Sequence, residues 1–82
     1  SKIDAIQQKA AQSHKLRLFI EMTDQYPIVF EILWSLSFNQ LIQEELRSNR
    51  IFMSKLTVLK NETNNERMQK TISGILWNLQ LI

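Results

Sequence analysis

The sequence predicts an all-α protein built from a repeated helical unit. Its 82 residues include one Gly and one Pro, which leaves few tight turns and no glycine-rich phosphate loop. Apolar residues recur at helical spacing along most of the chain. In addition, one apolar phrase occurs twice: residues 32–36 (ILWSL) return as residues 75–79 (ILWNL). Together these three observations favour helices in a repeating arrangement.

The repeat has a definite period. Trp34 and Trp77, the only two tryptophans, lie 43 residues apart. A period of ~40–47 residues is typical of arrays of helical repeats. A second correspondence pairs Leu16 with Leu56, at an offset of 40 residues. The difference of three residues falls in the loop before the third helix of the unit, where insertions are best tolerated.

Six helices follow from the apolar periodicity. Their expected ranges are about 2–12, 14–23, 27–38, 40–49, 50–60 and 64–81. In each set of three, the expected helices are short, medium and long in that order. We therefore expect a single helical-repeat domain over residues 1–82, with repeat one at about 1–38 and repeat two at about 39–82.

Polar residues mark the expected helix starts. The predicted N-caps are Ser13 for the second helix, Ser37 or Asn39 for the fourth, and Asn49 for the fifth. Thr63 and Glu66 have the spacing of a capping box before the sixth helix. Pro27 suits the first position of the third helix, because its missing N–H would have no partner there.

A three-helix unit of about 40 residues that ends in a Trp-bearing apolar helix resembles the armadillo repeat. The resemblance rests on residues 30–37 (FEILWSLS) and 73–80 (SGILWNLQ), which look like the third-helix motif of that family. It covers about two units, essentially the whole chain. The resemblance implies a fragment of a right-handed α-solenoid with two three-helix repeats. HEAT repeats, with two helices per unit, are the nearest structural alternative.

The third helices of armadillo proteins line a groove in which a Trp, and an Asn four residues later, hold an extended peptide. Trp34 and Trp77 match the Trp position, whereas Phe38 and Leu81 occupy the Asn position. The resemblance therefore implies a more apolar groove, formed by these four residues and suited to a helix or another protein surface. For each Trp, packing in the core between units is the alternative interpretation.

The sequence offers no set of residues for catalysis, a metal or a cofactor. It contains no Cys, and His14, its single His, is expected at a solvated helix start with no partner for nucleophilic or metal chemistry. The acidic residues form no pair within an apolar cleft that would suit acid–base catalysis. We therefore expect a protein that is not an enzyme and binds no cofactor.

The charge leaves a second function class open. The chain has a net charge of +2 and a pI near 9.2. A candidate basic edge consists of Lys55, Lys60, Arg67 and Lys70. A solvated helix face is the simpler interpretation of these residues. The alternative is a small basic helical domain that binds nucleic acid, which would need such charges to gather on one face.

The first function that we expect is that of a protein–protein interaction scaffold. Two repeats leave an uncovered apolar face at each end, which predicts a fragment of a longer array and a homo-oligomer joined through its terminal helices. No apolar run reaches the ~18 residues of a membrane span, and neither a signal-peptide core nor a Cys is present, so an intracellular location, cytoplasmic or nuclear, is expected. A non-repeat helical bundle with a coincidental doubled phrase is the remaining alternative.

Overall fold

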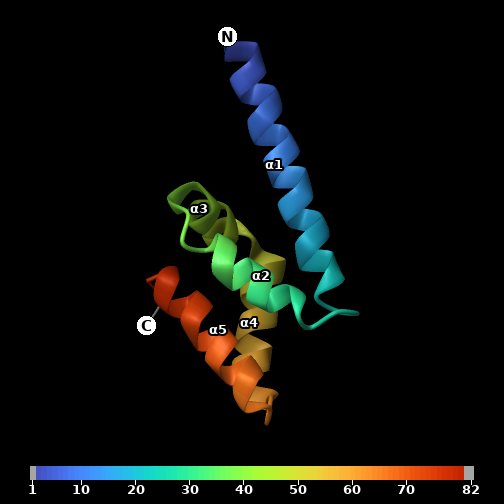
Figure 1. The fold of residues 1–82 in the computed structure, drawn as a ribbon, viewed down its shortest axis with the longest axis vertical. Helices are drawn as coiled ribbons and strands as arrows, with labels where there is room; N and C mark the ends of the chain where they lie inside the picture. Colours follow the sequence, from blue (N-terminus) through green and yellow to red (C-terminus); the bar gives the residue numbers. More distant parts are fainter. Residues whose placement is uncertain (1, 81–82) are drawn as a thin grey trace.

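A computed structural model describes residues 2–80 of the chain, apart from the side chains of residues 6 and 8–11. Within this range every regular element is an α-helix, which confirms the all-α prediction. The helices are α1 (Lys2–Met22), α2 (Val29–Leu36), α3 (Gln40–Ser48), α4 (Arg50–Glu62) and α5 (Glu66–Asn78). The amino-terminal half of α1 projects from a body that contains the other helices (Figure 1).

The predicted division of the first 23 residues into two helices is wrong, because α1 runs unbroken from Lys2 to Met22. A Ser in mid-helix costs only about 0.5 kcal/mol relative to Ala, and no Gly or Pro lies nearby to end the helix. Ser13 does not act as an N-cap. Its hydroxyl instead donates to the Glu45 carboxylate on α3 at 2.7 Å, which ties the middle of α1 to the body.

Two of the predicted caps are confirmed. The Asn39 side chain accepts from two backbone N–H groups in the first turn of α3. Asn49 ends α3 and also begins α4, since its side chain accepts from the Phe52 N–H at 3.0 Å. This double role explains how α3 and α4 meet without a loop. Ser37, the alternative cap for α3, instead donates its hydroxyl to the Trp34 carbonyl at the end of α2.

The capping box predicted for the last helix is wrong. Asn65 is the N-cap of α5, and its side chain accepts from the Met68 N–H at 3.0 Å. Thr63 instead ends α4, and its carbonyl accepts from the Gln69 amide at 2.8 Å. Because Asn caps helices at least as well as Thr, the nearer Asn takes this position. The helix accordingly begins two residues later than predicted.

Helix α2 also begins later than the sequence suggests. The backbone N–H groups of Val29 and Phe30 donate to the carbonyls of Tyr26 and Pro27, at 2.9 and 3.0 Å. These bonds span three residues, so a tight turn leads into α2. Pro27 lies in that turn, two residues before the helix starts.

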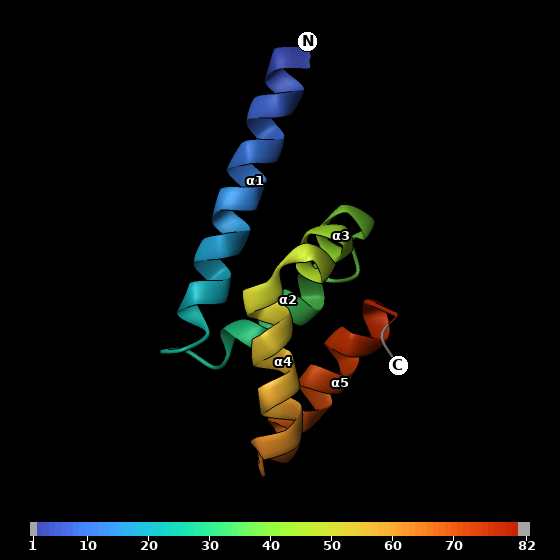
Figure 2. The ribbon, with the colours of Figure 1, turned by 180° about the vertical axis from the view of Figure 1, so that it is seen from behind.

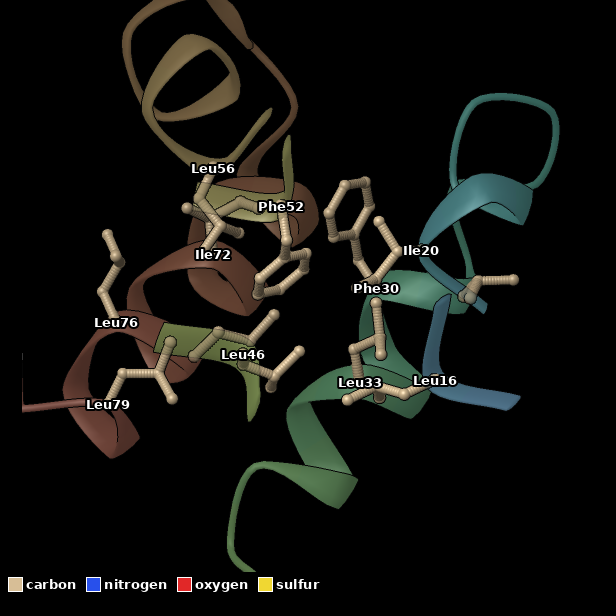
Figure 3. Close-up of a cluster of buried hydrophobic side chains, with 12 residues drawn as sticks. Leu16, Ile20, Phe30, Leu33, Leu46, Phe52, Leu56, Ile72, Leu76 and Leu79 are labelled. Carbon is tan, nitrogen blue, oxygen red and sulfur yellow. The ribbon is translucent and has the colours of Figure 1, made fainter. Parts of the chain in front are cut away.

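Every helix contributes apolar side chains to one core (Figure 3). Its buried members are Leu16, Ile20, Val29, Phe30, Leu33, Leu46, Phe52, Leu56, Ile72, Ile75, Leu76 and Leu79. The rings of Phe30 and Phe52 stack with their centroids 6.4 Å apart and join α2 to α4. Leu16 and Ile20 of α1 close one side of this core.

Helices α2 and α5, which carry the doubled phrase, lie side by side (Figures 1 and 2). The contacts between them include Glu31 with Arg67 at 2.9 Å, Trp34 with Gly74, and Ser37 with Asn78 at 2.8 Å. Residue numbers rise along both helices in the same order, so the two helices are parallel. The parallel arrangement sets two copies of one phrase next to each other in space.

The contact between Trp34 and Gly74 requires a residue without a side chain at position 74. A Cβ placed on Gly74 would overlap atoms of the Trp34 indole ring. Gly74 is the only glycine of the chain and has ordinary helical dihedrals without a positive φ. Space for the ring, and not backbone freedom, therefore explains the glycine. Trp34 is half-buried and packs against the core, so packing is the better interpretation of this Trp.

We predict that Gly74→Ala destabilises the protein by up to about 2 kcal/mol. In an open helix the same change stabilises by about 1 kcal/mol, but here the added methyl would overpack against the indole, which costs roughly 1–3 kcal/mol. Chemical denaturation measures the effect. Ser73→Ala, at the exposed neighbouring position, should be close to neutral.

A double-mutant cycle identifies the cause of this effect. In a Trp34→Leu background the ring is absent, so Gly74→Ala should no longer destabilise the protein. An equal loss of stability in both backgrounds would contradict the proposed overlap.

Candidate interaction surface

The three predicted groove residues that the structure describes differ in their environment. Trp34 is occupied by its contact with Gly74. Phe38 and Trp77 are each 70% exposed, and Leu81 lies outside the described residues. Of the residues predicted to line a groove, Phe38 and Trp77 are therefore the two that are shown to be exposed at the surface.

These two aromatic residues lie at the same end of the α2–α5 pair. Each is the chain neighbour of one partner in the Ser37–Asn78 hydrogen bond. The bond also uses the Asn78 amide within the fold, just as capping uses the side chain of Asn39. The fold thus uses the side-chain N–H of Asn78 and the side-chain oxygen of Asn39, which fits the sequence argument for a more apolar surface.

A larger hollow, which the sequence analysis missed, lies between the end of α1, the start of α2 and one face of α4. It has a volume of about 670 Å³. A second hollow of about 450 Å³ shares Pro27, Phe30, Leu59 and Met68 with the first, so the two are continuous. We call this continuous feature the apolar groove. Its floor is formed by Phe30, Leu59 and Met68, which are buried or half-buried, and its α4 side carries Ile51 and Val58.

The apolar groove is open to solvent on the α4 side. Ile51 is 68% exposed and Val58 is 48% exposed, although both are strongly apolar. They lie seven residues apart, which places them on one face of α4. Phe52 and Leu56 of the same helix are buried in the core, and Leu59 packs against it. The second apolar stripe, at positions 51 and 58, was the signal that could have revealed the groove.

Lys55, at the edge of the apolar groove, serves the fold. Its ammonium group donates to the Ile20 carbonyl at 3.1 Å and to the Thr23 hydroxyl at 3.3 Å. It also pairs with the Asp24 carboxylate at 3.0 Å. A cation at the carboxyl end of a helix stabilises carbonyls that have no partner within the helix. Lys55 therefore holds the end of α1 against α4.

The predicted basic edge is divided by such pairings. Arg67 pairs with Glu31 across the α5–α2 contact, and Lys55 is used as described above. Lys60 and Lys70 are exposed. Because binding to phosphates relies on many clustered cations, two exposed lysines give weak support to a nucleic-acid surface.

The described residues contain no group of three or more His, Cys, Asp or Glu side chains placed to hold a metal ion. His14 is exposed on α1. A search of the helices in residues 2–80 finds none with both the length and the apolar character required to cross a membrane.

Comparison with protein-family models, curated proteins and solved structures finds no match to the chain. Membership of the armadillo family therefore stays a prediction based on residues 30–37 and 73–80.

We predict that Lys55→Met lowers the free energy of unfolding by about 1–2 kcal/mol, because it removes a partly buried donor from two oxygens at the end of α1. Chemical denaturation and amide hydrogen exchange in the last turn of α1 measure the loss. Lys60→Met, on an exposed lysine of the same helix, should have almost no effect. Equal effects of the two substitutions would show that the contacts of Lys55 contribute nothing.

Proposed function

We propose that the chain is a protein-interaction module of armadillo-like helical repeats, and that it binds a partner in the apolar groove. The observation that carries the proposal is the exposure of Ile51 and Val58 beside a hollow of about 670 Å³. Exposed apolar residues scattered singly need no explanation, but a continuous patch beside a hollow is typical of binding surfaces. The hollow lies within the usual size range of ligand-binding clefts, roughly 300–1,000 Å³.

An amphipathic helix is the partner that best suits this groove. The floor offers apolar contacts from Phe30, Leu59 and Met68, which would accommodate side chains spaced three or four residues apart on a helix. Arg50 is exposed at the edge and would attract an acidic residue on the polar side of such a helix. Met68 adds an adaptable surface, because its side chain is unbranched and flexible.

The parallel α2–α5 pair supports the repeat part of the proposal. In a stacked array the equivalent helices of neighbouring units run in the same direction, and these two helices share both the phrase and the direction. Helices α3 and α4 precede α5 as a short and a longer helix, which fits repeat two. Helix α1 departs from this order, because it occupies the place of two helices without a break.

A nucleic-acid role has less support. Ion pairs engage Lys55 and Arg67, and the α4 side of the groove presents exposed Ile51 and Val58 beside Arg50. Such a surface favours a protein partner over a phosphate backbone.

We predict that helical peptides selected on the chain from a display library carry an apolar stripe, and that their binding is lost in Ile51→Asp/Val58→Asp. Burying two charges against an apolar peptide face would lower affinity at least roughly 100-fold. Lys60→Glu/Lys70→Glu is the matched control for two substitutions at exposed positions and should bind the same peptides. Fluorescence anisotropy measures both.

The opposite pattern would overturn the groove assignment. If the lysine variant lost peptide binding while the groove variant kept it, the basic residues would be the binding surface. A labelled oligonucleotide at low salt provides the parallel test of nucleic-acid binding.

We also propose that the chain self-associates through its terminal helices. Ile3 of α1 is 67% exposed and Trp77 of α5 is 70% exposed, so each terminal helix presents a large apolar side chain. The mass measured by light scattering is predicted to rise with concentration and to fall in Ile3→Glu. A strict monomer at high concentration with a cooperative melt would disprove self-association through the terminal helices.

A further inference from the structure

The two tryptophans of the doubled phrase lie in opposite environments. The Trp34 ring is covered by the adjacent α5, where Gly74 leaves room for it. Trp77 occupies the equivalent place in the second copy of the phrase and is 70% exposed. The first tryptophan therefore shows how a helix covers a ring at this position, and the second has no such cover from residues 2–80.

The cover over Trp34 has three features. Gly74 gives the ring access to the helix backbone. Thr71 and Ile75, on either side of that glycine, are buried. Four residues after the glycine, the Asn78 amide donates to the Ser37 hydroxyl at 2.8 Å. A parallel helix with this pattern is thus a complete partner for a Trp of this phrase.

We propose that Trp77 is the docking point for a further helix, parallel to α5, that presents a glycine to the indole ring and a side-chain N–H donor four residues later. The acceptor for that donor is Gln80, which stands 43 residues after Ser37. This inference rests on the proposed protein-interaction role but uses a surface other than the apolar groove. A large aromatic anchor is the usual energetic centre of such an interface.

A second copy of this chain does not supply the required helix. Stacking a copy in the register of α2 and α5 would place its Glu31 where Gly74 stands, because 31 is 43 residues before 74. Even a Cβ overlaps the ring at that position, and Glu31 adds a carboxylate that Arg67 holds in place. Helix α5 is the helix of this chain that carries a glycine, and its Gly74 already faces Trp34 of the same molecule. The occupant is therefore a glycine-bearing helix of another protein, and any self-association of the folded chain uses another arrangement.

Glu31→Gly tests the proposal directly, because it creates the missing glycine on a helix that already matches the rest of the pattern. Ile28, the N-cap of α2, and Ile32 within α2 are exposed at the places equivalent to Thr71 and Ile75. Ser35 offers a hydroxyl donor in place of the Asn78 amide. The variant is expected to form head-to-tail assemblies whose mass in light scattering exceeds that of the wild type at least about twofold. Iodide quenching of Trp fluorescence should fall as these assemblies form.

Two control variants separate this effect from loss of the Glu31–Arg67 ion pair. Glu31→Leu also removes the pair but keeps a Cβ, so it should behave as the wild type does. Glu31→Gly/Trp77→Ala should show no more association than the Trp77→Ala chain. Equal association of the Gly and Leu variants, or association that persists without Trp77, would overturn the proposal.

A second measurement decides the question if Glu31→Gly fails to fold. A labelled peptide of residues 65–80 with Trp77→Gln carries the Gly74 face of α5 and is offered to the wild-type chain. Binding is expected to be lost in the Trp77→Ala chain and with a peptide that carries Gly74→Leu. Binding that survives both changes would place the peptide elsewhere and refute the Trp77 assignment. Neither measurement involves Ile51 or Val58, so its failure leaves the groove proposal intact.

Discussion

The close approach of the Trp34 indole to the backbone of α5 is the constraint on which the α2–α5 pair depends. It requires a residue without a side chain at position 74, and the chain places its only glycine there. Polar contacts flank the ring on both sides, from Glu31 to Arg67 and from Ser37 to Asn78. With α2 and α5 fixed in parallel, Leu33 and Ile72 are enclosed in the core between the helices.

Side-chain hydrogen bonds at helix ends hold the remaining elements in place. Asn49 serves two helices at once, which lets α3 turn directly into α4. Lys55 of α4 donates to the Ile20 carbonyl near the end of α1, and Ser13 joins α1 to α3. Among the described residues no buried side-chain nitrogen or oxygen lacks a hydrogen-bond partner. Residues that the sequence suggested for capping or for a basic edge therefore connect helices that are distant in the chain.

The surface left over by this arrangement defines the proposed interactions. Ile51 and Val58 line the apolar groove, whereas Trp77 and Phe38 lie at the carboxyl end of the α2–α5 pair. Both regions are apolar, but they differ in shape: the groove is a hollow, and Trp77 is a single ring exposed on a largely polar helix face. They suit different partners, an amphipathic helix in the groove and a glycine-bearing parallel helix at Trp77.

Local patterns in the sequence determined that the chain is helical, where α3 and α4 begin, and that each of the two apolar phrases lies at the carboxyl end of a helix. These features depend on spacing and on caps within a few residues, as with Asn39 and Asn49. Tertiary structure alone decided that α1 continues through Ser13, because a Ser tolerates a helix and finds a partner on α3. It also decided that Trp34 is half-buried and Trp77 is exposed, since the two local phrases are nearly identical and only the first is covered by another helix. The apolar groove likewise arises from elements far apart in sequence, so only their packing could reveal it.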